Sequence, residues 1–171
     1  MLPSLIANKI TFPSSSSIGK FLILLFGVGL LPPFSNSVLS ELRGLQYLPL
    51  EAQLCLPIGD CLLLEVADTP EEKSIGLMGR TVLSKGTGMW FQFSPAKIVK
   101  FWMHNMNIPV DMIFISDGFI TAIETNLPTC LLSKCPKYGP SKLVDGVIEL
   151  TAGEVERLDI KVGDFVDLRY R

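Results

Sequence analysis

The chain has 171 residues, of which 48% are hydrophobic and 19% are charged. A domain usually has about 100–150 residues, so this length fits one domain with an extension. Two of the 15 basic residues and none of the 17 acidic residues lie in residues 1–40, which leaves a net charge of −4 in residues 41–171. A nucleic-acid-binding surface needs a basic face that displaces counterions. The mildly acidic body therefore argues against nucleic acid as a partner.

The first 40 residues have the features of an export signal. Lys20 precedes an apolar run at residues 21–31. That run is short for a membrane span, which needs about 20 residues, and fits the apolar core of a secretory signal, about 7–15 residues. We predict a signal peptide over residues 1–40, cleaved after Ser37 or, preferably, Ser40, with an uncleaved N-terminal anchor as the alternative. The predicted location is periplasmic or otherwise extracytoplasmic, with membrane contact only through this segment if it is uncleaved.

The four cysteines all follow this segment. An even number of cysteines in an exported protein indicates disulfides. Four cysteines allow three pairings, and proximity in sequence favours Cys55–Cys61 and Cys130–Cys135. Zinc sites use closer pairs or histidine ligands, and His104 is the only histidine. We predict two structural bridges, each holding a short turn, with a metal or redox role as the alternative.

A helix start follows the first pair of strands. Thr69 is placed as N-cap, Pro70 at the first helical position and Glu72 to close a capping box. Gly79 is placed to end the helix. The sequence predicts a short helix of at most about three turns at this point.

The rest of residues 41–171 consists mainly of short apolar runs that are typical of strands. Asp117-Gly118 between two such runs is a strong hairpin signal, residues 127–140 read as a loop held by the second bridge, and residues 153–158 as a helical turn. The predicted strands are residues 51–56, 61–66, 88–93, 98–103, 110–115, 119–124, 147–150 and 165–169. We expect a single, mainly β (α+β) domain over residues 41–171: a curved antiparallel sheet or small barrel of about eight short strands with one or two short helices.

A series of motifs runs through this domain in a fixed order. They are residues 64–72, 76–80, 86–91, 101–106 and 108–115, followed by Pro128, Cys130, Cys135, Tyr138, Glu149-Leu150, Ala152-Gly153 and Gly163-Asp164. Over residues 63–168 the chain resembles domain-of-unknown-function family 192. The resemblance implies a mainly strand fold with a small helical part, often with an export signal or membrane association, and it implies no reaction. The family more often has Lys or Asn in place of His104, and Thr in place of Met106, which weakens any mechanism that relies on His104.

Asp111 lies inside an apolar strand. Alternation places it on the face opposite Val110 and Met112, and a buried carboxylate is costly unless it is paired. Its structural interpretation is an ion pair, with Arg80 as the nearest candidate, or acceptance of backbone N–H groups. Its functional interpretation is an acid with a perturbed pKa that binds a cation or polar ligand, or acts as a general base.

Residues 101–105 form a candidate pocket wall. Strand alternation puts Phe101 and Met103 on one face and Trp102 and His104 on the other. Together with Asn105 and a carboxylate, the second face suits a carbohydrate or an amino-acid-like ligand. A tryptophan whose indole N–H finds a partner is equally common in an ordinary core.

Five methionines are clustered within the same part of the sequence. Thioethers together with His104 suit Cu(I), because soft ligands select it. The competing interpretation, which we favour, is that methionine fills irregular core space beside the tryptophans. The methionines are Met78, Met89, Met103, Met106 and Met112.

The chain has no serine in a nucleophile-elbow setting, no zinc-protease motif, no phosphate loop and no dinucleotide fingerprint. We therefore expect an extracytoplasmic small-ligand-binding or accessory domain whose partner is a small molecule or a protein, with no cofactor. The candidate ligand-binding residues are Arg80, Trp102, His104, Asn105 and Asp111. Two alternatives stay open: a small hydrolase or lyase that uses Asp111 as acid or base, and a copper-binding protein that uses methionine and histidine.

Overall fold

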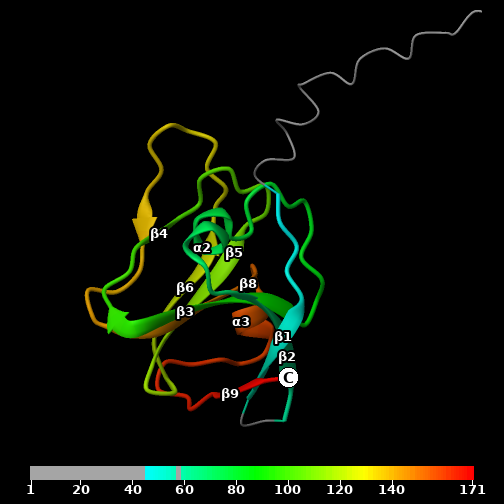
Figure 1. Ribbon diagram of the computed structural model, residues 1–171, viewed down its shortest axis with the longest axis vertical. Coiled ribbons are helices and arrows are strands. Elements are labelled where there is room, and N and C mark those ends of the chain that lie inside the picture. The colour runs from blue at the N-terminus through cyan, green and yellow to red at the C-terminus, as the bar shows by residue number, and fades with distance from the viewer. Residues whose placement is uncertain (1–44, 57–58) are drawn as a thin grey trace, which may run out of the picture. The chain divides into compact units, whose positions relative to one another are not determined.

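The computed structural model describes residues 45–56 and 59–171. This part of the chain forms nine strands and two short helices (Figure 1). The predicted signal peptide, with its cleavage site, lies outside the described residues. Within the described residues, no helix is long and apolar enough to cross a membrane. The elements are β1 Leu50–Cys55, β2 Cys61–Ala67, α2 Pro70–Ile75, β3 Thr87–Lys97, β4 Phe101–Trp102, β5 Val110–Ser116, β6 Phe119–Leu127, β7 Lys137–Tyr138, β8 Val144–Thr151, α3 Glu154–Arg157 and β9 Asp167–Tyr170.

Seven strands form one sheet in the order β6-β5-β8-β3-β2-β1-β9, and β4 pairs with β7 in a second sheet. All pairs in the larger sheet are antiparallel except β2 and β3. Those two are parallel because α2 carries the chain back between them. The predicted mainly β fold with short helices is confirmed. The sheet is mixed and open, with β6 and β9 as its edges.

Two hairpins form where turn chemistry predicts them. Cys55 and Cys61 face each other at the end of the β1–β2 ladder and are joined by a disulfide. Asp117 and Gly118 connect β5 to β6 with φ angles of 52° and 78°. Both turn positions need positive φ, which explains the Asp-Gly pair. The second predicted bridge, Cys130–Cys135, is also present.

The helix α2 begins as predicted and ends earlier. The Thr69 side chain accepts a hydrogen bond from the Glu72 backbone, and Glu72 closes the capping box. The helix ends at Gly76, whose φ of 52° and ψ of −130° stop it, and not at Gly79, where we expected it to end. Gly79 also has positive φ, 76°, but lies in the turn that follows.

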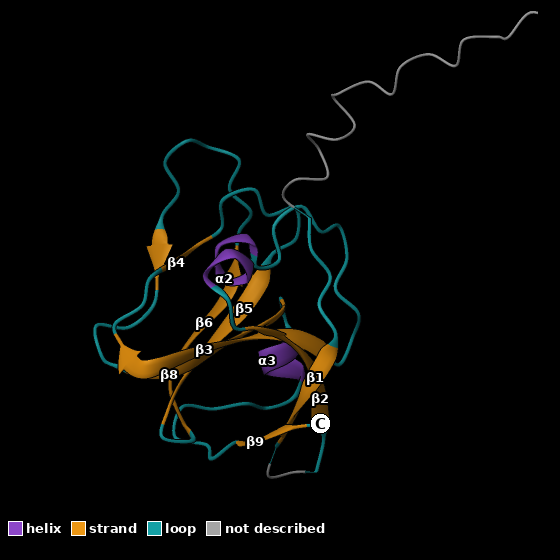
Figure 2. Cartoon of the chain, viewed as in Figure 1, coloured by secondary structure: helices purple, strands orange, loops and turns teal. Residues whose placement is uncertain are grey.

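The large sheet is buried on both faces, each against its own apolar core. Alternation along β5 shows this: Met112 and Phe114 enter one core, and Ile113 and Ile115 enter the other. The turn after α2 adds Leu77 to the core of Met112, and α3 adds buried residues to the opposite core. In Figure 2 the two helices accordingly lie on different sides of β3. We call the core that contains Met112 the α2-side core and the other the α3-side core.

The predicted strand at residues 98–103 is largely wrong. Only Phe101 and Trp102 form β4, and they pair with the two residues of β7 in the small sheet. Pro136 and Pro140 flank the β7 segment. Proline cannot donate to a strand ladder, so the pairing partner of residues 98–103 is short and the strand is short as well.

Candidate functional site

Arg80 is buried, and its partner is Glu65. Its two terminal nitrogens each lie 2.6 Å from a Glu65 carboxylate oxygen, and it also donates to the Gln46 carbonyl at 2.8 and 3.1 Å. The Tyr47 ring covers the guanidinium at 4.5 Å. The expected pairing of Arg80 with Asp111 is therefore wrong. Arg80 ties residues before β1 to β2, and it is 2% exposed, so it does not open onto a cleft.

Asp111 is held by backbone donors on the α3 side of the sheet. Its carboxylate accepts hydrogen bonds from the N–H groups of Asn126, Gly153 and Val155 at 2.8, 2.9 and 3.0 Å. It is 0% exposed, although it borders a surface pocket of about 290 Å³. Three backbone donors satisfy a buried carboxylate well. The geometry therefore agrees with the structural interpretation of Asp111, in which it anchors the start of α3.

Trp102 and His104 lie on one side of their segment, as alternation predicts. Their ring centroids are 5.1 Å apart, while Phe101 and Met103 turn toward the α2-side core. Trp102 is 47% exposed, and Asn105 is also exposed, with φ at 55°. Gly79, the residue before Arg80, donates its N–H to the Asn105 carbonyl at 2.9 Å, but the Arg80 side chain is buried against Glu65 and Gln46. The Asp111 carboxylate is bound by backbone N–H groups on the α3 side of the sheet, so the candidate ligand residues do not form one site.

The methionines pack in the α2-side core. Met89, Met103, Met106 and Met112 are at most 3% exposed, and Met78 is partly buried against the same core. They fill space among phenylalanines, which favours the core interpretation over Cu(I) binding. Residues 45–56 and 59–171 also contain no group of three or more His, Cys, Asp or Glu that could hold a metal ion.

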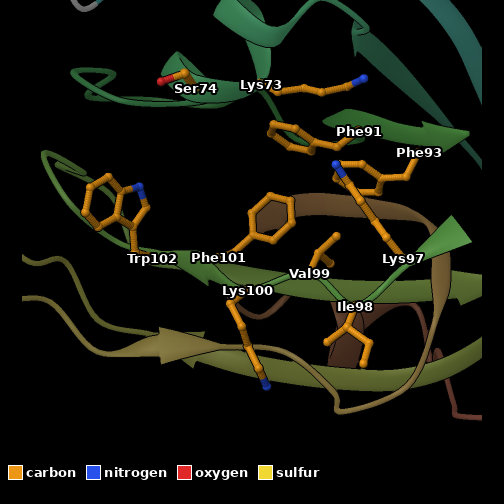
Figure 3. Close-up of a pocket in the computed structure, with 10 residues that line it drawn as sticks. All are labelled: Lys73, Ser74, Phe91, Phe93, Lys97, Ile98, Val99, Lys100, Phe101 and Trp102. Atoms are coloured by element: carbon orange, nitrogen blue, oxygen red, sulfur yellow. The ribbon is translucent and has the colours of Figure 1, made fainter. Parts of the chain in front are cut away.

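A pocket of about 330 Å³ opens between α2 and the β3–β4 segment. Its apolar wall is built from Phe91, Phe93 and Phe101. The Phe101 ring centroid lies 5.1 Å from that of Phe91 and 6.4 Å from that of Phe93, and both pairs are edge to face. Trp102 forms the end of this wall (Figure 3). We call this pocket, together with a smaller one that adjoins it at Phe91, Phe101 and Trp102, the aromatic cleft.

Lysines stand at the rim of the aromatic cleft. The Lys97 ammonium lies 4.6 Å from the Phe93 ring centre, and the Lys73 ammonium lies 5.5 Å from it. Lys73 also donates to the Asp68 carbonyl at 2.7 Å. In Figure 3 the Lys97 side chain runs toward Phe93, whereas Lys100 points away from the aromatic rings. The cleft thus combines an apolar wall with positive charge at its entrance.

A smaller pocket of about 30 Å³ adjoins the outer one, because both are lined by Phe91, Phe101 and Trp102. Glu149 of β8 lies at this inner pocket and is 4% exposed. Among the described residues, no group donates a hydrogen bond to its carboxyl. Burial raises the pKa of Glu149 to about 8, and the nearby Arg80 charge opposes this only partly. A carboxyl that is protonated at neutral pH therefore lies at the floor of the cleft.

Gly76 keeps space open above Glu149. A Cβ atom at this position would lie 3.3 Å from the Phe91 ring and 3.9 Å from a Glu149 carboxyl oxygen. The same residue ends α2 with positive φ, a conformation that L side chains rarely adopt. One glycine thus both stops the helix and leaves the inner pocket unfilled.

The sequence predicted a pocket wall at residues 101–105, and Phe101 and Trp102 line the aromatic cleft, but Glu149, Phe91 and Phe93 were not selected as site residues. The available signal was an acidic residue inside an apolar strand, Val147 to Leu150, which is the same signal that drew attention to Asp111. What the sequence could not provide is the environment of each carboxyl. Asp111 accepts hydrogen bonds from N–H groups at α3, whereas Glu149 lies at a pocket in which no described residue donates a hydrogen bond to its carboxyl.

The two disulfides indicate an oxidising, extracytoplasmic environment, where such bonds persist. Among solved structures, the chain is similar to a protein of unknown function from Novosphingobium aromaticivorans, with 31% identity and a TM-score of 0.62 over 68% of this chain and 83% of that one. It is also similar to a proposed transcription regulator from Sinorhizobium meliloti, with 32% identity and a TM-score of 0.60 over 68% of this chain and 91% of that one. No curated protein matches. The family model for DUF192, described as "Uncharacterized ACR", matches residues 57–168, and the chain belongs to this family.

Proposed function

We propose that this protein is an exported, extracytoplasmic binding domain that holds a small organic anion with an apolar body in the aromatic cleft. The observation that carries the proposal is the joint presence, in one opening, of a phenylalanine wall, rim lysines and a nearly buried carboxyl to which no described residue donates a hydrogen bond. Ligand pockets are commonly apolar, with a few polar groups that fix orientation.

The aromatic wall supports an apolar or aromatic ligand body. Phe91, Phe93 and Phe101 present ring faces and edges toward the same space, and edge-to-face contacts favour a further ring. The outer volume of about 330 Å³ is at the small end of the range for drug-sized ligands. A ligand of one or two rings therefore fits the space better than a polymer.

The charge of the ligand follows from the rim and the floor together. Lys97 and Lys73 attract an anionic group at the entrance. An ionised Glu149 at the floor would repel the same group, but a protonated Glu149 does not, and it can donate a hydrogen bond to a ligand oxygen. The inner volume of about 30 Å³ admits one small group, about the size of a water molecule.

The experiment is a thermal-shift screen of the protein with aromatic carboxylates, aryl phosphates, neutral sugars and amino acids, followed by fluorescence titration of each hit. Trp102 is exposed at the cleft and Trp90 is buried, so Trp102 reports occupancy. We expect aromatic anions to bind, and their affinity to fall as pH rises through about 8, where Glu149 ionises.

Matched variants separate the cleft from the general surface. Lys97→Gln removes a rim charge and should weaken anion binding about fivefold to tenfold, whereas Lys142→Gln, an exposed lysine outside the lining, should leave it unchanged. A Phe101→Ala change that leaves every hit's affinity intact would contradict the proposed site. So would a screen in which no anion shifts the melting temperature.

A second candidate function is a small hydrolase or lyase, and Glu149 rather than Asp111 favours it. A carboxyl with a pKa near 8 in a cleft is suited to general acid catalysis, while the carboxylate of Asp111 is occupied by three backbone donors. Glu149→Gln distinguishes the two functions, because the amide resembles the protonated acid in shape. A binding domain keeps its ligand affinity at pH 7 in this variant, whereas an enzyme keeps binding and loses turnover.

A further inference from the structure

Positive charge is concentrated in two segments of the chain that lie side by side. Residues 94–110 and 125–144 contain five lysines and no acidic residue, although the whole chain has a net charge of −2. The two segments are joined by the pairing of β4 with β7 and by an isolated backbone β-bridge between His104 and Cys130. We call these two segments the basic lobe. All five of its lysines are exposed.

The tip of the basic lobe exposes two leucines. Leu131 is 73% exposed and Leu132 is 69% exposed, and both lie between the cysteines of the Cys130–Cys135 bridge. Leu131 is the most exposed large apolar side chain in the described part of the chain. Two adjacent leucines held open to water have no apolar cover among residues 45–56 and 59–171, so an apolar phase outside this part of the chain is needed to cover them.

The loop that carries these leucines is fixed to its neighbours. Besides the disulfide, Cys130 exchanges backbone hydrogen bonds with Met103 and Asn105 at 3.1 and 3.0 Å. The Leu132 carbonyl lies 3.2 Å from the His104 ring nitrogen. The exposure of the leucines is therefore imposed by the fold, because the loop is tied down on both sides.

Trp102 extends the apolar tip toward the aromatic cleft. The Trp102 and His104 ring centroids are 5.1 Å apart, and the His104 ring nitrogen contacts the Leu132 backbone carbonyl, so His104 links Trp102 to the loop that carries the leucines. Across the β4–β7 ladder, Trp102 is directly paired with Lys137. Leucines at a tip, with tryptophan and lysines set behind them, are the arrangement by which proteins enter the interface of a bilayer.

We propose that the basic lobe docks on an anionic lipid membrane, with Leu131 and Leu132 inserted among the acyl chains and Trp102 at the level of the headgroups. Lys134 and Lys137 would meet the lipid phosphates, because a lysine near an anionic surface is attracted over about a Debye length. This contact is independent of the N-terminal segment, and it brings the mouth of the aromatic cleft close to the bilayer.

The test uses the full chain and vesicles of phosphatidylcholine, with or without phosphatidylglycerol in equal amount, that carry brominated acyl chains. Bromine quenches tryptophan only at short range, and the chain has two tryptophans, of which Trp90 is buried. We expect quenching of Trp102 by the anionic vesicles, weak quenching by the neutral ones, and loss of the effect in Trp102→Phe. Because quenching reports the position of the lobe, it is informative even where the N-terminal segment itself holds the chain on the vesicle.

Three variants distinguish this surface from others. Leu131→Ser/Leu132→Ser should lose most of the quenching, and Lys134→Gln/Lys137→Gln should reduce apparent binding to anionic vesicles about thirtyfold. The matched control is Phe119→Ser/Val162→Ser, which removes exposed apolar side chains remote in sequence from the loop, and it should quench as the wild type does. The proposal is overturned if the anionic vesicles do not quench Trp102, or if the leucine variant and the control behave alike.

Discussion

Asp111 and Glu149 lie on adjacent strands, β5 and β8, and face opposite sides of the sheet. Both are almost fully buried. Asp111 accepts three backbone hydrogen bonds, whereas no described residue donates one to Glu149, which borders the aromatic cleft. Burial alone therefore does not mark a functional carboxyl. The informative property is whether the protein itself satisfies it.

The largest expected effect comes from the buried ion pair of Arg80 and Glu65, in which the protein itself pairs both charges. Arg80→Met leaves the Glu65 carboxylate buried without its partner, so we expect a loss of about 3–5 kcal/mol in the free energy of unfolding, measured by urea denaturation. Arg157→Met is the control, because its pair with Glu154 is partly exposed and solvent screens it, so its loss should change the free energy of unfolding much less. Equal losses in the two variants would show that burial of the Arg80 pair adds nothing to its contribution to stability.

Asp111→Asn tests whether the Asp111 carboxylate stabilises the fold without taking part in ligand binding. The amide keeps the shape but loses the charge and one acceptor, so we expect a loss of about 3 kcal/mol in unfolding free energy and no change in ligand binding. Asp159→Asn, an exposed surface change, should cost less than about 0.5 kcal/mol. A stable Asp111→Asn protein that has lost ligand binding would make Asp111 functional after all.

Glu149 should make the stability of the protein depend on pH. Its folded-state pKa, about 8, lies above the unfolded value of 4.5, so the folded state holds a proton that the unfolded state has released. Its stabilising contribution is complete below the unfolded value and is lost as pH rises through about 8. We expect the wild type to lose about 2 kcal/mol between about pH 6 and pH 8. Urea denaturation of Glu149→Gln should lack this loss, and an identical pH profile in both proteins would contradict the assignment.

Gly76→Ala tests whether the inner pocket must stay open for a ligand to bind. The new methyl group would approach the Phe91 ring at 3.3 Å on a backbone with φ of 52°, so we expect a loss of about 1–2 kcal/mol. We also expect weaker ligand binding, because the methyl group narrows the space above Glu149. Gly163→Ala also has positive φ but nothing within 4 Å of the added atom, and it should lose stability without affecting binding.

The sequence predicted most of the local structure, because turn and cap chemistry acts over a few residues. Asp117-Gly118, the Thr69 capping box and the two short disulfide loops were all identified and are all present. The parallel pairing of β2 with β3 was not predicted, because it depends on how the chain returns through α2. The short β4 was missed for a similar reason, since its partner is distant in sequence.

The candidate site was harder to predict than the fold. Arg80 and Asp111 were predicted as candidate ligand-binding residues, with a mutual ion pair as the structural alternative. Both are buried, and their partners, Glu65 and the backbone at α3, come from distant parts of the chain. The aromatic cleft combines residues of α2, β3, β4 and β8. No local pattern encodes such a meeting, so Glu149 is distinguished only by its three-dimensional surroundings.

The most direct measurement is a titration of the Glu149 side-chain carboxyl by carbon-13 NMR, with Glu149→Gln to assign its signal. We expect a midpoint near pH 8, and a further change in that midpoint when an aromatic anion occupies the cleft. A midpoint near the unfolded value of 4.5, unaffected by any such ligand, would show that Glu149 is ionised at neutral pH and would contradict the proposed site.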